Sequence, residues 1–390
     1  MLELIVAETI AKNPTLKATG FKTEASKAAV GTIKLEPPQA AIEFYQAPLT
    51  SFPNPFKDQM EFDYSLQQTF PFPGKLSAMA KAERDRSKML GAEQQTTRQE
   101  IIRLTKTAFF ELYLTDRLFD INSSSQYLMR NFIDISKKQY ELGIGRQTDI
   151  LRAQTELSKL MNDSIALVQS RQSAVAMINT YRNKPVEIPV DVIPEISPEL
   201  ILVPALDSLL AIAEKNRPEL NSMQFNIDMR SSELISAKKE FYPDIMVRGM
   251  YKQMINLPDD WSLMLGFTLP VAPWSIGKYS AAVSRSNALV KQSQAEYDNM
   301  RNMVASQVKD VLARVVSSQA QVDLIQNTII PQARQTMHSA LSGYQSGKQD
   351  FLMLIDTQKM LLLAQQDYHR AVMSFFLNHA NLERAIGILK

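Results

Sequence analysis

Apolar and polar residues alternate strictly in one nine-residue segment in the second half of the chain. Residues 261–269 place Trp, Leu, Leu, Phe and Leu at every second position, with small or polar residues and one Met between them. In a β-strand this pattern puts an apolar row on one face and a second row on the other. Nine residues also match a tilted strand that crosses a bilayer. We predict a strand here; a half-buried strand of a soluble protein is the alternative.

The same pattern occurs earlier, because the sequence is internally duplicated. Residues 61–77 alternate in the same way and, like the later segment, continue through Thr-x-Pro to Gly-Lys. The motif Tyr140-x-x-Gly143 returns as Tyr344-x-x-Gly347, an offset of 204 residues (344 − 140). We predict two structural repeats joined by a Pro-rich linker. Their boundaries are 1–190, 191–204 and 205–390.

Each repeat is predicted to contain a broken helix, a β-hairpin, a long helix and a return helix. In the long helices the apolar positions are spaced alternately by four and three residues, as in packed helices. The predicted strands are 39–46, 60–70, 243–251 and 261–269, and the predicted helices are 2–34, 76–142, 150–182, 206–239, 278–345 and 351–388. The two hairpin tips, 47–58 and 252–260, are polar loops.

Composition excludes several classes of function. A net charge of +2 in 390 residues argues against nucleic acid as a partner. With no Cys, the chain has no disulfide, thiolate metal site or Cys nucleophile. The 3 His show no metal spacing and the 19 Met are expected to fill the core, so no metal site, cofactor or catalytic residue is predicted. No secretory leader is visible, as in a mature exported protein or a cytosolic one.

Four membrane-length strands cannot close a barrel, and open strand edges are not tolerated in lipid. If the strands cross a bilayer, several chains must therefore share one barrel. The long helices would continue that barrel as a tube, with the polar hairpin tips at one end and the glycine turns at the other. This arrangement predicts a conduit.

Several motifs resemble the TolC family of outer-membrane efflux ducts in Gram-negative bacteria. They are Asn216-Arg217-Pro218-Glu219-Leu220, Tyr242-Pro243-Asp244 and the Tyr-x-x-Gly turn before each return helix. The resemblance covers essentially the whole chain. Phe70-Pro71-Phe72-Pro73-Gly74-Lys75 resembles the heavy-metal branch, the CusC and CzcC type.

The resemblance implies a mainly α-helical chain with a small β part. Three copies would form a shared 12-stranded outer-membrane β-barrel above an α-barrel in the periplasm. The implied partners are outer-membrane lipid, a periplasmic adaptor and an inner-membrane pump of the resistance–nodulation–division type. The duct would be passive, without enzymatic activity, and heavy-metal cations are one possible cargo.

The resemblance also identifies candidate site residues. The family's two acidic rings at the entrance fall on Asp356 and on Met353, so one carboxylate ring is expected instead of two. The family's gate latch falls on Tyr344 and Asp149, and its arginine is replaced by Gln349 with Lys348 beside it. The expected adaptor-contact turns contain Gly143, Gly145 and Gly347.

Each site has a simpler interpretation. Asp356 could be a solvated carboxylate that the helix dipole favours, and Tyr344 could be a packed turn residue. For the whole chain, the alternative is a soluble coiled-coil scaffold or periplasmic adaptor. A scaffold would bury the row of Trp261, Leu263, Leu265, Phe267 and Leu269 in protein, whereas a duct would leave it facing lipid.

Overall fold

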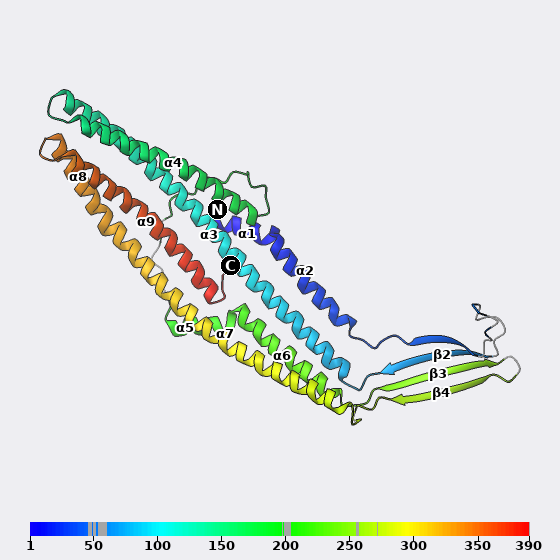
Figure 1. Ribbon diagram of the computed structural model, residues 1–390. Helices are drawn as coiled ribbons and strands as arrows, with labels where there is room; N and C mark the ends of the chain where they lie inside the picture. Colours follow the sequence, from blue (N-terminus) through cyan, green and yellow to red (C-terminus); the bar gives the residue numbers. More distant parts are fainter. Residues whose placement is uncertain are drawn as a thin grey trace. The chain divides into compact units, whose positions relative to one another are not determined.

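The computed structural model describes residues 1–45, 49, 52–53, 61–196, 198, 204–254, 257–270 and 272–389. Helices and strands follow one another twice in the same order (Figure 1). The elements of the first half are α1 (Leu2–Lys12), α2 (Pro14–Ala29), η1 (Val30–Thr32), β1 (Gln39–Tyr45), β2 (Glu61–Phe70), α3 (Lys75–Glu141) and α4 (Gln147–Tyr181). Those of the second half are α5 (Leu206–Asn216), α6 (Pro218–Lys239), β3 (Ile245–Met254), β4 (Asp260–Phe267), α7 (Ile276–Leu324), η3 (Ile325–Ile329), α8 (Ile330–Gln345) and α9 (Phe351–Ala385).

The chain divides into two compact units, and each unit draws on both halves of the sequence. Unit 1 contains residues 1–19, 94–218 and 301–390, and unit 2 contains 20–93 and 219–300. The predicted repeat boundaries therefore do not coincide with the compact units. They stay a prediction, because linker residues 197 and 199–203 lie outside the described residues.

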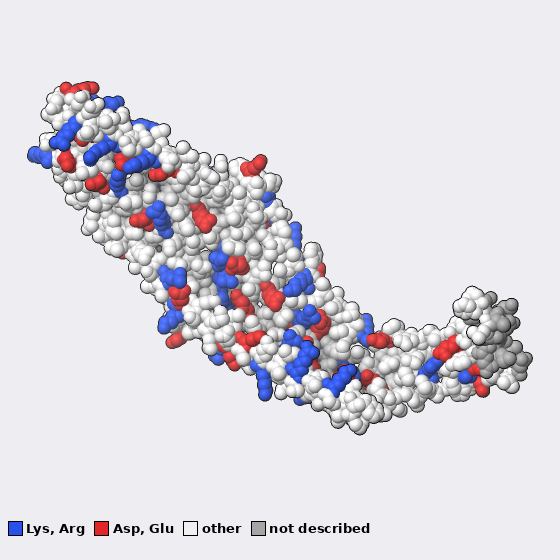
Figure 2. Space-filling view, viewed as in Figure 1, with Lys and Arg blue, Asp and Glu red and all other residues white. Residues whose placement is uncertain are grey.

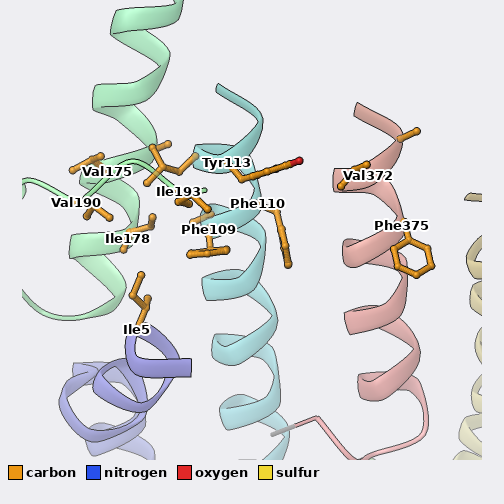
Figure 3. Close-up of a cluster of buried hydrophobic side chains, with 14 of the residues drawn as sticks. Ile5, Phe109, Phe110, Tyr113, Val175, Ile178, Val190, Ile193, Val372 and Phe375 are labelled. Atoms are coloured by element: carbon orange, nitrogen blue, oxygen red, sulfur yellow. The ribbon is translucent and has the colours of Figure 1, made fainter. Parts of the chain in front are cut away.

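Unit 1 is a helical bundle with one large apolar core. Figure 3 shows Ile5 of α1 facing Phe109 of α3 and Ile178 of α4 across this core. Val190 and Ile193 of the segment after α4 pack into the same cluster, and Phe375 of α9 also belongs to it. A second cluster lies toward the glycine turns and joins α3, α4, α8 and α9.

The predicted heptad seams differ in how well they match the buried positions. The second predicted seam is buried at Val304, Val308, Val315, Ser318 and Val322 of α7. Its other members are not buried: Val311 and Ile325 are half-buried and Ile329 is exposed. In α3 most residues of the predicted seam are only half-buried, because the buried stripe is displaced toward Leu112, Asp116 and Met129. The half-buried seam residues are Leu114, Leu118, Ile121, Leu128 and Ile135. A long helix packed against several neighbours buries a wider face than a two-helix seam does.

Unit 2 contains a four-stranded antiparallel sheet in the order β1-β2-β3-β4 (Figure 1). The two predicted hairpins are therefore joined, because β2 of the first half pairs with β3 of the second half. Opposite residues share a face of the sheet, so the register assigns every strand residue to one of two faces.

The two faces of the sheet differ completely in charge. The apolar face carries Ile42, Tyr64, Leu66, Val247, Trp261, Leu263, Leu265 and Phe267, and none of its described strand residues is charged. The polar face carries all six charged residues of the described strands, which are Glu43, Glu61, Asp63, Arg248, Lys252 and Asp260. On the view in Figure 2, charged side chains gather toward the loop end of the sheet. Leu265 is 61% exposed on the apolar face and its row neighbours Leu263 and Phe267 are exposed too, so no described residue covers this row.

Most predicted boundaries shift by a few residues, and in the sheet the shifts are clearest at β3 and β4. β4 ends at Phe267 instead of residue 269, because Thr268 closes the ladder by bonding Asp244 and Pro270 follows. β3 continues to Met254, beyond the predicted residue 251. The helix predicted over 278–345 is interrupted at η3, a π-helical turn just before Pro331, since proline removes a backbone donor.

Among the described helices, none combines the length and the hydrophobicity that crossing a membrane requires. Most of the predicted polar loop 47–58 lies outside the described residues, as do residues 255 and 256 of the loop 252–260.

Candidate functional site: two glycine turns and the start of α9

Two turns of the same construction reverse the helices of unit 1. α3 ends in a turn where Gly143 has φ +72°, and the N–H groups of Ile144 and Gly145 donate to the Gln139 carbonyl over 3.1 and 2.9 Å. α8 ends in a turn where Gly347 has φ +70°. A left-handed residue that closes a helix in this way is normally glycine, because it has no Cβ.

The second turn repeats the bonding of the first. The N–H groups of Lys348 and Gln349 donate to the Gly343 carbonyl over 2.8 and 3.1 Å. The Gln349 side chain lies against Gly343, where a Cβ would come within 2.9 Å of it. The Gln349 side chain therefore packs over its own turn, and both Gln349 and Lys348 remain exposed.

A buried glutamine ties the two turns together. The side-chain amide of Gln139, on α3, donates to the carbonyls of Tyr344 and Gln345 at the end of α8 over 3.5 and 3.2 Å. Those carbonyls belong to the last turn of a helix, where backbone acceptors lack helical partners. Sequence reasoning missed Gln139, although it directly precedes Tyr140 of the first turn motif.

Tyr344 is 5% exposed and its hydroxyl donates to the Ser136 hydroxyl over 3.2 Å. Burial raises the pKa of Tyr344, and the Asp149 carboxylate raises it further through its charge and a hydrogen bond. The structure thus brings together the tyrosine and the aspartate that were predicted as a pair. Ser136 is a third member that the sequence did not indicate.

Met353 and Asp356 both lie on the exposed face of α9. α9 begins at Phe351, and the Asp350 carboxylate caps it by accepting from the Met353 N–H over 2.9 Å. The exposed face continues with Met360 and Leu363 at heptad spacing. Between residues 353 and 363, Asp356 is therefore the one carboxylate of this exposed seam, and the seam continues with the ion pair of Asp367 and Arg370.

Asp356 also lines a groove of about 620 Å³ between the beginnings of α4 and α9. Arg146, Arg152 and Lys359 line the same groove, so cationic groups outnumber carboxylates there. Lys359 pairs with Glu156 over 3.0 Å. Burial raises the pKa of Glu156, but hydrogen bonds from Lys159 and Lys359 outweigh this effect and lower it. Sequence reasoning missed these cations, which lie on two helices far apart in the chain.

Within the described ranges no cluster of His, Asp or Glu could hold a metal ion. The arrangement provides two turns joined by side-chain hydrogen bonds from α3.

Comparison with known proteins relates the second half of the chain to one family. The sequence profile of the family described as "Outer membrane efflux protein" matches residues 209–388. The chain is 22% identical to the alkaline protease secretion protein AprF of Pseudomonas aeruginosa over 308 residues, which are 75% of this chain and 62% of AprF. It is 20% identical to the cobalt-zinc-cadmium resistance protein CzcC of Cupriavidus metallidurans over 44% of this chain and 41% of CzcC. The chain thus spans less than two thirds of these relatives.

The fold agrees over the whole chain. The crystal structure of the channel CusC superposes with a TM-score of 0.84, over 99% of this chain and 92% of CusC, at 16% sequence identity. The similarity includes both the helices and the four strands. The chain therefore has the fold of this outer-membrane channel, and its second half is similar to the outer membrane efflux family.

Proposed function

We propose that three copies of this chain form a passive duct across the outer membrane. The observation that carries the proposal is the sheet: all six charged residues of its described strands share one face, and the other face is apolar and exposed. A strand pair in a bilayer barrel needs this division between a lipid face and a lumen face.

The open edges of the sheet support a trimer. β1 and β4 are the edge strands of a four-stranded sheet. In lipid their unpaired backbone groups require partners. Three sheets joined edge to edge form a barrel of 12 strands, above the minimum of about eight that bacterial outer-membrane barrels use.

The turns of unit 1 are the proposed contact with a periplasmic adaptor, through Gly143, Gly145 and Gly347, and beyond it with an inner-membrane pump of the resistance–nodulation–division type. We assign Tyr344 and Asp149 to a latch that keeps the two turns together in the closed duct. In this chain the proposed latch uses hydrogen bonds, with Gln349 where the resembling family has an arginine.

Asp356 and Met353 are the proposed constriction. Three symmetry-related Asp356 carboxylates would attract cations, and the groove cations Arg152 and Lys359 weaken that attraction. For the cargo, the name of CzcC favours heavy-metal cations, whereas the name of AprF points to protein export.

The alternative is a soluble scaffold or adaptor. The exposure of Trp261, Leu263, Leu265 and Phe267 argues against it, because a scaffold would bury this row within the chain. The mass of the detergent-solubilised protein and its conductance in planar bilayers test the proposal. Trimers with ohmic conductance are expected; a monodisperse monomer in plain buffer would refute it.

A further inference from the structure

The two glycine turns share one backbone but differ in the surface that they present. With the offset of the internal duplication, Leu142 corresponds to Ser346 (346 − 142 = 204) and Ile144 to Lys348 (348 − 144 = 204). The hydrogen bonds match position for position, because the N–H groups of Ile144 and Lys348 donate to the carbonyls of residues 139 and 343, which share the same offset. The backbone of the turn therefore does not dictate which side chains it carries.

The first turn carries three exposed apolar side chains within five residues. Tyr140 is 49% exposed, Leu142 is 74% exposed and Ile144 is 67% exposed. The corresponding side chains of the second turn are a buried tyrosine, an exposed serine and an exposed lysine. Since the second turn forms the same hydrogen bonds without exposed apolar groups, folding does not require them in the first turn. Clustered exposed apolar residues are typical of a surface that a partner covers.

The first turn is held in one shape before any partner binds. Gly143 has φ +72°, and the N–H groups of Ile144 and Gly145 share the Gln139 carbonyl as acceptor. The Gln139 side chain in turn donates to the end of α8. A preorganised surface loses little conformational entropy on binding, which favours insertion into a fitted pocket of a folded protein. A lipid surface, for which binding depends on the buried apolar area, needs no such fixed shape.

Cationic residues surround the apolar side chains of the first turn. Between residues 137 and 146, the exposed cations are Lys137, Lys138 and Arg146, and Glu141 is the one carboxylate. The matching stretch of the second turn, 341–350, carries one cation and one carboxylate. Protein interfaces combine an apolar centre with a polar rim, and charges across the rim are complementary. The partner of the first turn is therefore expected to carry acidic groups around its pocket.

We infer that Tyr140, Leu142 and Ile144 form an apolar knob that inserts into an acid-rimmed apolar pocket on a periplasmic adaptor protein. The knob lies at the end of the helices of unit 1, where α3 turns into α4 (Figure 1), and not along their sides, where helices of neighbouring copies would pack. The second turn adds no apolar contact. The inference rests on the proposed function, which assigns both turns to the adaptor contact, and it identifies the turn and the chemistry that carry this contact.

Surface plasmon resonance between the detergent-solubilised protein and a purified periplasmic adaptor of the same bacterium tests the knob. The double variant L142S/I144S gives the first turn polar side chains, and its Kd is expected to rise by roughly 30-fold or more, as at an interface hot spot. Leu4→Ser removes a leucine of similar exposure from α1 and should leave the Kd unchanged. An unchanged Kd in L142S/I144S, or an equal rise in Leu4→Ser, would overturn the inference.

Two further variants keep the test decisive. Ser346→Leu gives the second turn the leucine of the first and should leave the Kd unchanged, because no pocket faces it. Ile144→Ser alone should weaken binding if the double variant fails to assemble as a heat-resistant trimer. A gain of affinity in Ser346→Leu, equal to the loss in the double variant, would show that the two turns contribute alike and would overturn the inference.

The cationic rim is tested through the association rate. K137Q/K138Q should slow association severalfold at low salt, whereas the dissociation rate should change little because the apolar contact is kept. The difference from wild type should shrink as salt screens the charges. Faster association of this variant would contradict an acidic rim on the adaptor.

Potassium conductance in planar bilayers separates this inference from the proposed function. A protein that conducts and binds the adaptor equally well without the knob refutes the knob alone. A protein that binds the adaptor through the knob but does not conduct refutes the duct. Wild-type protein in nanodiscs that binds phosphatidylglycerol vesicles through Leu142 and Ile144, and binds no adaptor, would assign the knob to a lipid surface and overturn the inference.

Discussion

Lys75 and Asp244 form an ion pair that joins two sequence motifs at the end of the sheet. Lys75 Nζ lies 3.1 Å from both carboxylate oxygens of Asp244, and the Phe72 N–H donates to the same carboxylate over 2.8 Å. Glu240 also contacts Lys75, over 3.0 Å. Burial lowers the pKa of Lys75, but the two carboxylates more than offset this and raise it. The pair thus holds the point where strands give way to helices in unit 2.

Replacing Lys75 should destabilise this junction. Lys75→Met leaves Asp244 and Glu240 without their shared cation, and because both are partly exposed we expect a cost of about 2 kcal/mol, below that of a fully buried pair. Urea unfolding of the detergent-solubilised protein measures it. The matched control is Lys278→Met, at the equivalent position of the second Gly-Lys motif, where the lysine is exposed and the change should stay within about 0.5 kcal/mol. Equal costs would mean that the pair contributes nothing specific.

The apolar face should not accept charge. Leu265→Arg, on β4, should cost roughly 2–4 kcal/mol if this face meets hydrocarbon near the middle of the bilayer. Ser262→Arg, on the polar face of the same strand, should be much milder. Heat-resistant trimer on gels reports barrel assembly. Similar effects of the two substitutions would contradict the assignment of the faces.

Asp356→Asn should lower cation selectivity. In the proposed trimer three Asp356 carboxylates near the axis would attract cations, and removing them would leave Arg152 and Lys359 to dominate the groove. Single-channel reversal potentials in a salt gradient measure the change, and trimer assembly should stay intact. Asp367→Asn, further along α9, is the control. Unchanged selectivity would show that Asp356 is only a solvated helix carboxylate.

Loosening the bonds between the turns should favour the open duct. Gln139→Leu removes the amide that bridges α3 to the Tyr344 and Gln345 carbonyls, and Asp149→Asn removes the charge beside Tyr344. Both should raise the open fraction in bilayer recordings, with unitary conductance unchanged. The control variant Gln345→Leu replaces an exposed side chain but keeps the backbone carbonyl that Gln139 binds, so it should behave as wild type. If Gln139→Leu leaves the open fraction unchanged, the bridge does not hold the gate.

Acid should destabilise unit 1 through His369. Burial lowers the pKa of His369 below its ordinary value of 6.5, and its Nδ1 lies 3.0 Å from the Tyr113 hydroxyl. The folded state therefore favours neutral histidine. Its contribution to the free energy of unfolding is fully present above pH 6.5 and decreases as the pH drops below that value. Melting temperatures between pH 8 and pH 5 should fall less in His369→Gln than in wild type. The exposed His338→Gln serves as the control and should retain the wild-type slope.

Local periodicity was sufficient to predict most elements. The alternation in 261–269 predicts β4, and the spacing of Val304 to Val322 predicts the buried seam of α7, because side-chain direction repeats with a fixed period in each structure. The glycine motifs likewise predict both turns, since only a residue without Cβ adopts their backbone readily. These features depend on residues close together in the chain.

Contacts between distant segments were decided only by the tertiary structure. Pairing of β2 with β3 brings Ser65 opposite Met250, and the register of β4 then sets Met264 between Met246 and Met250. Gln139 reaches the end of α8 for the same reason. Alternation within a strand says which residues share a face, but strand register and helix packing depend on how the two halves of the chain meet, which no local pattern encodes.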